Sequence, residues 1–411
     1  MIIGKIEKDR VLMNNKFYIY YFGVIISNIG NALTTFAVPL FILDLTKSTL
    51  HLSIVSALQL IPFLIFGLPF GAIIDNVNIK KLMQYSDIAR FAIYLIFAYI
   101  TYFYSGDIVI IAVYITSILS GICYVFHTIA ESTLIPYLVA NEKLTRANSL
   151  IYSIQYVTNF IVPILGGKMY EYDHIGLFFL FDAVTFLLSF LILFVLKIEF
   201  KDSKKGNNFI LGSTKIISDV KESVIYLKEN KFLLKVLVIV AISNIIICPY
   251  YNCLIDFLKN SLDLKASIIG VVEGIYSLGA LVGALLVDYL VKKINKINIV
   301  IFCIGIDALC RLLLPYNSSI IFICVMMIII ELTSSILNIM VITIRQESIE
   351  QEYLGRLNSI FKTVLLGVNP IGLLIGGLIT IKIGSYNNMI LISCLCLILF
   401  IVSLTSFKEK K

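Results

Sequence analysis

Ionisable side chains interrupt several long apolar runs, and they are the residues of this sequence best placed to do chemistry. Glu331 stands inside Ile-Ile-Ile-Glu-Leu-Thr, and Glu273, Asp307 and Asp182 interrupt other runs. An ionisable group is expensive in hydrocarbon and marks a functional site by default. An unpaired acid in a dry cavity can load and release a proton near neutral pH. These four acids are therefore the expected proton carriers, with Glu331 and Glu273 favoured.

Two acid–arginine pairs have helical spacing. Asp307 and Arg311 are four residues apart, and Asp87 and Arg90 are three apart. Residues at these separations share a helix face and can form an ion pair. A structural role is favoured for both pairs, although Asp307 stays among the proton carriers.

His127 and Glu131 also share a helix face. Histidine changes its charge in the right pH range for proton transfer, but a packing or hydrogen-bonding role is favoured for His127. The pair lacks a third metal ligand and a nucleophile, so the sequence predicts neither a metal site nor an enzyme.

Amide side chains within the apolar runs are the expected substrate-binding residues. The alternative, hydrogen bonds from helix to helix, is given equal weight for each of them. They are Asn28, Asn31, Gln155, Asn159, Asn244 and Asn338.

The composition identifies the elements that must position these residues. Of 411 residues, 59% are hydrophobic and 14% are charged, whereas a soluble domain carries about 25% charged residues. Backbone polar groups in lipid must be satisfied internally, which requires helices when the apolar runs are about 20 residues long. The net charge of +7 lies between these runs and not on a soluble face, so no nucleic-acid partner is expected. The eight cysteines are expected to be small buried hydrophobes.

Twelve membrane spans are predicted. The N-terminus, the C-terminus and the turns predicted on the same side of the membrane hold 25 Lys and Arg residues. The turns on the opposite side hold 5. The positive-inside rule then places both termini in the cytoplasm of a cell-membrane protein. The predicted spans are 17–43, 52–74, 82–104, 108–131, 147–171, 175–197, 233–256, 266–290, 297–315, 319–343, 357–381 and 386–406.

The spans form two similar halves. Leu144-Thr-Arg-Ala-Asn-Ser matches Leu354-Gly-Arg-Leu-Asn-Ser 210 residues later. Parallel repeats of this kind are typical of carriers that bind substrate between the halves. The predicted divisions are an N-terminus at 1–16, a bundle at 17–198, a linker with an amphipathic helix at 199–232, a bundle at 233–406 and a tail at 407–411.

The turn after the second span is predicted to form a gate. Gly71 and Asp75 precede Lys80 and Lys81 there, and in the second half Gly283 and Asp288 precede Lys292 and Lys293. Asp75 is expected to face the start of span eleven, near Gly355 and Arg356. The positive end of a helix contributes about 0.3–2 kcal/mol to such a contact.

This turn resembles the signature of the major facilitator superfamily. Three motifs resemble its macrolide-efflux and multidrug-exporter branch: Phe126-His127-Thr128, Leu134-Ile-Pro-Tyr-Leu-Val and Asp182-Ala-Val-Thr-Phe. The resemblance implies a two-bundle fold that exports amphipathic small molecules as proton enters. The alternative cargo is an endogenous metabolite, lipid or siderophore.

The sequence departs from the signature at three positions. Asn76 stands where relatives usually carry Arg, Asn78 where they often carry Gly or Asp, and Ile79 where they usually carry a basic residue. Asn78 is expected to support the turn because asparagine tolerates left-handed backbone.

No Gly-x-x-x-x-Gly-Lys-Ser/Thr loop occurs in the sequence, so an ATP-driven pump is not expected. The predicted energy source is an ion gradient. The expected partners are protons, membrane lipid and a small-molecule substrate. The protein is expected to be a monomer and to need no cofactor.

Replacing Asp75 with Asn is expected to abolish or cripple transport while leaving expression intact, because the contact with the opposite helix start loses its charge. Uptake into vesicles, normalised to the amount of protein on an immunoblot, measures this. Wild-type transport by Asp75→Asn contradicts the gate.

Overall fold

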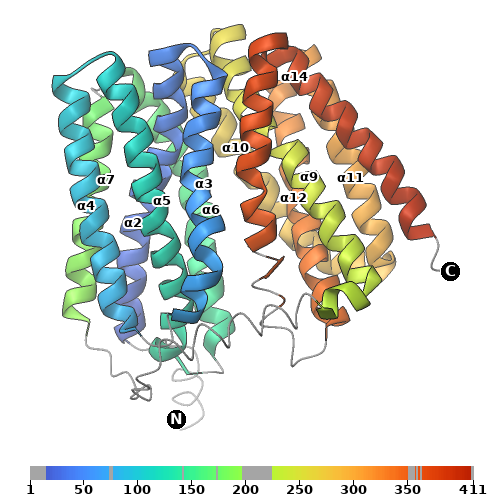
Figure 1. Ribbon diagram of the computed structural model, residues 1–411, viewed down its shortest axis with the longest axis horizontal. Helices are drawn as coiled ribbons and strands as arrows, with labels where there is room; N and C mark the ends of the chain where they lie inside the picture. Colours follow the sequence, from blue (N-terminus) through green and yellow to red (C-terminus); the bar gives the residue numbers. More distant parts are fainter. Residues whose placement is uncertain are drawn as a thin grey trace, which may run out of the picture.

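The computed structural model describes residues 15–73, 77–140, 143–172, 175–196, 225–349, 357, 360–361 and 363–408, and every regular element among them is helical. Six helices form the N-terminal half, and the remainder form the C-terminal half (Figure 1). The first half comprises α2 (Asn15–Thr46), α3 (Thr49–Ile73), α4 (Ile79–Phe103), α5 (Asp107–Leu138), α6 (Leu144–Tyr172) and α7 (Ile175–Val195). The second comprises α9 (Lys231–Asp256), η3 (Phe257–Ser261), α10 (Ala266–Lys293), α11 (Lys296–Leu313), η4 (Leu314–Tyr316), α12 (Ile320–Ser348) and α14 (Asn369–Lys408).

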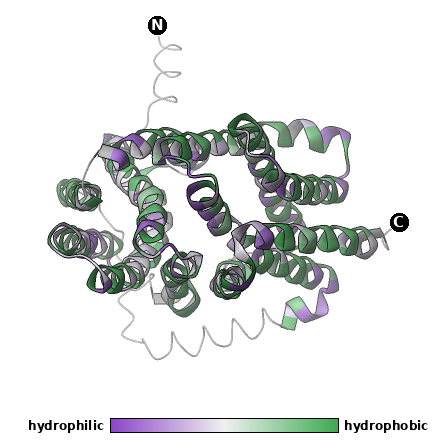
Figure 2. Cartoon of the chain, turned by 90° about the horizontal axis from the view of Figure 1, so that it is seen from above, coloured by the Kyte–Doolittle hydropathy of each residue, from purple (hydrophilic) through white to green (hydrophobic). Residues whose placement is uncertain are grey.

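Eleven helical stretches in the described residues are long and apolar enough to cross a membrane. The last of them contains Gly384, whose backbone is not helical (φ 78°, ψ 163°) and divides α14 into two segments. Predicted spans eleven and twelve fall on either side of this break. The all-helical fold class is confirmed, and hydrophobic residues make up most of the helices in the view from above (Figure 2).

Asparagine side chains cap several helices at the face where α2 begins, here called the proximal face; the opposite face is the distal face. The Asn78 side chain accepts a hydrogen bond from the Lys81 backbone N–H (3.0 Å), and Asn230 and Asn295 cap α9 and α11 in the same way. Asn78 has extended backbone (φ −68°, ψ 103°). Asn78 therefore does not use the left-handed conformation that asparagine tolerates, because an N-cap residue takes extended backbone.

The two halves contact each other through α6 with α10 and through α3 with α14. Glycines permit the first contact: a Cβ on Gly270 would clash with the Pro163 carbonyl oxygen, and one on Gly274 would lie 2.6 Å from the Phe160 carbonyl oxygen. Both glycines lie toward the distal end of α10. In Figure 1 the bundles meet at the distal face and spread apart toward the proximal face.

Several sequence predictions fall outside the described residues. Asp75, Gly355 and Arg356 are among them, as is most of the predicted linker. Of the linker's amphipathic helix, residues 225–229 are described, and they are helical.

Gly270→Ala is expected to lower the thermal unfolding temperature, because its methyl group meets backbone across the α6–α10 contact; overpacking costs about 1–3 kcal/mol. Gly67→Ala is the matched control, since a Cβ there would lie 3.7 Å from the Thr363 hydroxyl oxygen, an ordinary contact. Unfolding of the purified protein in detergent measures both variants. Equal unfolding temperatures for Gly270→Ala and the wild type contradict the close approach.

Candidate functional site

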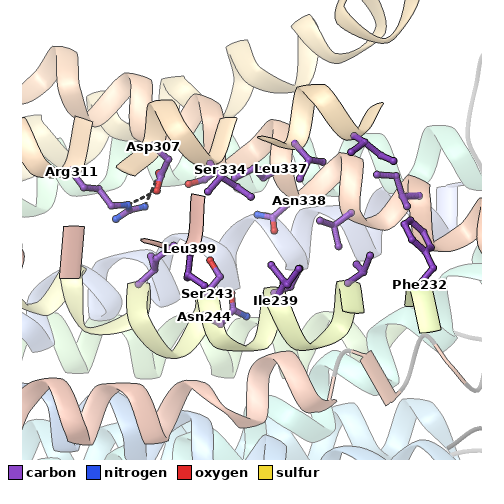
Figure 3. A pocket seen from close by; sticks show the side chains of 18 residues that line it. Phe232, Ile239, Ser243, Asn244, Asp307, Arg311, Ser334, Leu337, Asn338 and Leu399 are labelled. Carbon is purple, nitrogen blue, oxygen red and sulfur yellow. Dashed lines mark hydrogen bonds and ion pairs between the residues drawn. The ribbon is translucent and has the colours of Figure 1, made fainter. Parts of the chain in front are cut away.

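An elongated cavity of about 180 Å³ lies within the C-terminal half, between α9 on one side and α11 and α12 on the other (Figure 3). We call it the slot. Each helix lines it with a single face, since the lining positions recur every three or four residues. They are Phe232, Val236, Ile239, Val240, Ser243, Asn244 and Ile247 on α9; Ile297, Val300, Ile304, Asp307 and Arg311 on α11; Ser334, Leu337, Asn338, Val341 and Ile344 on α12; and Leu399 on α14.

The slot is apolar with a few polar groups at its middle. Its α9 side runs from Phe232 near the proximal face to Ile247, a length of about 22 Å at the rise of an α-helix. Ser243, Ser334 and Asn338 contribute polar atoms between these ends (Figure 3). An apolar cavity with a few convergent polar groups is the usual form of a small-molecule site.

A buried ion pair forms one wall at the deeper end. Arg311 donates to both carboxylate oxygens of Asp307, through Nε (2.7 Å) and Nη2 (3.0 Å). The guanidinium also lies over the Tyr250 ring, 4.9 Å from its centre, and the Tyr250 hydroxyl donates to the Arg311 carbonyl oxygen. A two-point pair of this kind neutralises both charges, so the deeper end of the slot has no net charge.

Two of the six predicted amides line the slot. Asn338 faces it from α12, and Asn244 lines it while donating to the Leu365 carbonyl oxygen (3.1 Å). The other four amides are not among its lining residues: Asn28 and Asn31 are half-buried in α2, and Gln155 and Asn159 are exposed on α6.

Two of the other three predicted proton carriers accept hydrogen bonds from hydroxyl groups. The Tyr251 hydroxyl donates to Glu273 (2.6 Å), and the Thr34 hydroxyl donates to the fully buried Asp182 (2.5 Å). Glu331 is half-buried on α12. Neutral partners of this kind are compatible with either protonation state, because a hydroxyl can both donate and accept.

The N-terminal half contains a second buried charged group, which we call the N-half cluster. Asp87 accepts from the Ser189 hydroxyl (2.8 Å), and its other oxygen lies 3.2 Å from His127 Nδ1 and 3.5 Å from Arg90 Nη2. Glu131, one turn beyond His127, accepts from the Tyr20 hydroxyl (3.1 Å).

Charged residues join the halves at the distal face, and the sequence analysis missed them. Asp44 of α2 accepts from the Tyr170 hydroxyl (2.7 Å) and pairs with Lys259 of the C-terminal half (2.9 Å). Glu171 accepts from the Ser267 backbone N–H (2.8 Å) at the start of α10. We call these interactions the distal contact. Charges at the ends of spans indicate the orientation of the helices in the membrane but not which charges pair with each other. The sequence therefore carried no signal for the distal contact.

The described part of the predicted gate shows contacts within each half. Lys80 donates to the Phe194 carbonyl oxygen (3.3 Å) near the end of α7, where a cation complements the helix dipole. Gly283 packs α10 against the Leu332 carbonyl oxygen of α12. Gly71 lies in α3 and Asp288 in α10. Among the described residues no group of three or more His, Cys, Asp and Glu side chains could hold a metal ion.

Comparisons with known proteins agree on one family. The major facilitator model described as "transmembrane secretion effector" matches residues 11–410. Macrolide efflux protein A of Streptococcus pyogenes is 26% identical over 384 residues, which are 92% of each chain. The staphyloferrin A transporter of Staphylococcus aureus is 24% identical over 73% of this chain and 74% of its own.

Solved structures share the fold. A bacterial homologue of the iron transporter ferroportin in its inward-facing state has a TM-score of 0.73 at 16% identity, covering 94% of this chain and 98% of that one. The nucleoside transporter NupG has a TM-score of 0.71 at 12% identity, covering 96% and 100%.

Asp307→Asn is expected to lower the unfolding temperature of the purified protein, because it leaves the Arg311 charge buried without a partner, at a cost of about 3–5 kcal/mol. The double variant Asp307→Asn with Arg311→Met is expected to recover much of that loss. An unfolding temperature for the double variant below that of Asp307→Asn contradicts a neutralised pair.

Proposed function

Because the chain belongs to the transmembrane secretion effector family of the major facilitator superfamily, we propose that it exports amphipathic, macrolide-like small molecules by alternating access as protons enter. Its relatives and structural neighbours are transporters and not enzymes, and it is a membrane protein that crosses the bilayer several times. The proposed setting is the cell membrane, with the termini and the proximal face in the cytoplasm.

The observation that carries the proposal is the slot. Its walls are apolar along most of its length, and Ser243, Ser334 and Asn338 supply hydrogen-bonding groups at its middle. A molecule that is mainly apolar and carries several hydroxyl or carbonyl groups matches this lining. The neutralised Asp307–Arg311 pair adds a polar surface without a net charge, which suits a cargo of low charge density.

Alternating access requires contacts that form in one state and break in the other. The distal contact is formed here, so the structure is closed at the proposed extracellular face. In the opposite state Asp44 and Lys259 separate, and Asp75 takes up its proposed contact with the start of span eleven. Glu331 and Glu273 remain the proposed proton carriers of the C-terminal half, because each is an acid within a membrane-spanning helix.

The second proposed function is export of an endogenous metabolite, lipid or siderophore. A shallow hollow beside the slot favours it: Phe232, Ile297 and Ile344 line both. The hollow adds Lys292 and Lys293, together with Lys296, which pairs with Glu347 in the same hollow. An anionic cargo would meet these lysines on its way into the slot. The staphyloferrin A transporter is among the relatives.

Ser334→Leu is expected to reduce macrolide export roughly tenfold, as its larger side chain fills the slot and removes about 1.4 kcal/mol of binding free energy. Growth inhibition of an expressing strain by a panel of macrolides and other amphipathic drugs measures this. Ser319→Leu is the matched control, since Ser319 is exposed at the distal start of the same helix and makes no capping hydrogen bond.

If expression of the wild type changes sensitivity to none of the drugs, the endogenous cargo is favoured. If Ser334→Leu and Ser319→Leu export equally well, the slot is not the binding site. A requirement for Na⁺ in inside-out vesicles would contradict coupling to protons.

A further inference from the structure

The two halves carry buried acid–arginine pairs at related places. Asp87 and Arg90 lie on α4, the third helix of the first half, and Asp307 and Arg311 lie on α11, the third helix of the second. Both arginines lie over an aromatic ring: Arg90 is 4.5 Å from the centre of Phe186, and Arg311 is 4.9 Å from the centre of Tyr250. The pairs therefore permit a direct comparison of how each half satisfies its charges.

The C-terminal pair is closed. Arg311 donates to both oxygens of Asp307, at 2.7 and 3.0 Å. The described structure shows no histidine paired with Asp307. Each charge is met by its partner, so this pair does not need a proton to balance it.

The N-terminal pair is open. Arg90 Nη2 lies 3.5 Å from Asp87 Oδ1, and neither Nη2 nor Nε of Arg90 makes a hydrogen bond among the described residues. Arg90 is 2% exposed and Asp87 0%, so water does not replace these bonds at the surface. His127 Nδ1 lies 3.2 Å from the same oxygen, and the other oxygen of Asp87 accepts from the Ser189 hydroxyl.

The formal charges around His127 do not balance while its imidazole is neutral. Asp87 and Arg90 face it from α4, the Tyr20 hydroxyl reaches the neighbouring Glu131 from α2, and Cys123 and Glu131 lie on α5 itself. With a neutral imidazole and ionised acids, two carboxylates oppose a single guanidinium. An unbalanced charge is costly at this depth, and one proton on His127 removes the imbalance.

We propose that His127 binds the coupling proton, with Asp87 as its counter-ion and Arg90 as the group that displaces it. This inference rests on the proposed proton-coupled export and adds a proton site in the half that does not contain the slot. Release occurs when Arg90 closes a two-point pair with Asp87 like that of Arg311 with Asp307. The imidazolium then loses its counter-ion, its N–H bond breaks, the proton passes to water and a neutral imidazole remains.

His127→Gln tests the assignment in proteoliposomes, with erythromycin as the probe. The variant is expected to lose accumulation of the drug driven by a pH gradient while it retains exchange of labelled for unlabelled drug, which needs no net proton movement. His51→Gln is the matched control, since His51 hydrogen-bonds Tyr114 away from the N-half cluster. This control is expected to behave like the wild type in both assays.

Accumulation by His127→Gln equal to that of the wild type overturns the inference. Exchange without pH-driven accumulation in the wild type contradicts proton coupling itself, which is a failure of the proposed function.

If His127→Gln does not fold, the proton site can be tested in a protein that keeps His127. The chain has three histidines, so His51→Gln with His174→Gln leaves a single imidazole signal in a nuclear magnetic resonance spectrum. If His127 binds a proton reversibly, that signal moves from the position of a neutral imidazole to that of a protonated one as the pH is lowered. A signal that stays at the neutral position throughout overturns the inference whatever the transport assays show.

Discussion

A charge within hydrocarbon needs a partner, and this constraint organises the polar side chains of the protein. Asp307 satisfies it with a two-point contact to Arg311, and Asp182 does so with threonine hydroxyls. Asp87 satisfies it only in part, because an arginine and a histidine share one of its oxygens. A fully satisfied pair supports the fold, whereas a partly satisfied one leaves a place for a proton.

The two halves repeat the same helices but use them differently. In the C-terminal half, α9 stands away from α11 and α12 and leaves the slot between them. In the N-terminal half, the N-half cluster lies among α4, α5 and α7, and Ser189 and Phe186 pack against its charges. The proposed cargo site and the proposed proton site at His127 therefore lie in different halves. The α6–α10 and α3–α14 contacts join the two halves.

The sequence predicted the helices well because a segment that crosses the hydrocarbon must be apolar along its length and must satisfy its backbone hydrogen bonds as a helix. It also predicted that Asp307 could pair with Arg311, since that pairing is local to one helix. It could not predict the slot, because a cavity depends on how far neighbouring helices stand apart. The distal contact was missed for a related reason: Asp44 and Lys259 are far apart in the chain, and their charges alone do not reveal a shared position. His127 was given a packing or hydrogen-bonding role from its family-like position near the end of its helix. Its distance from Asp87 is a tertiary property, which the sequence does not show.

The central claim is that cargo binds within the C-terminal half. A structure determined with a transported macrolide bound tests this most directly. The account predicts density for the drug between α9, α11 and α12, in contact with Ser334 and Asn338. Density between the two halves, in contact with Asn28 and Asn31 of α2 and with an empty slot, would contradict it.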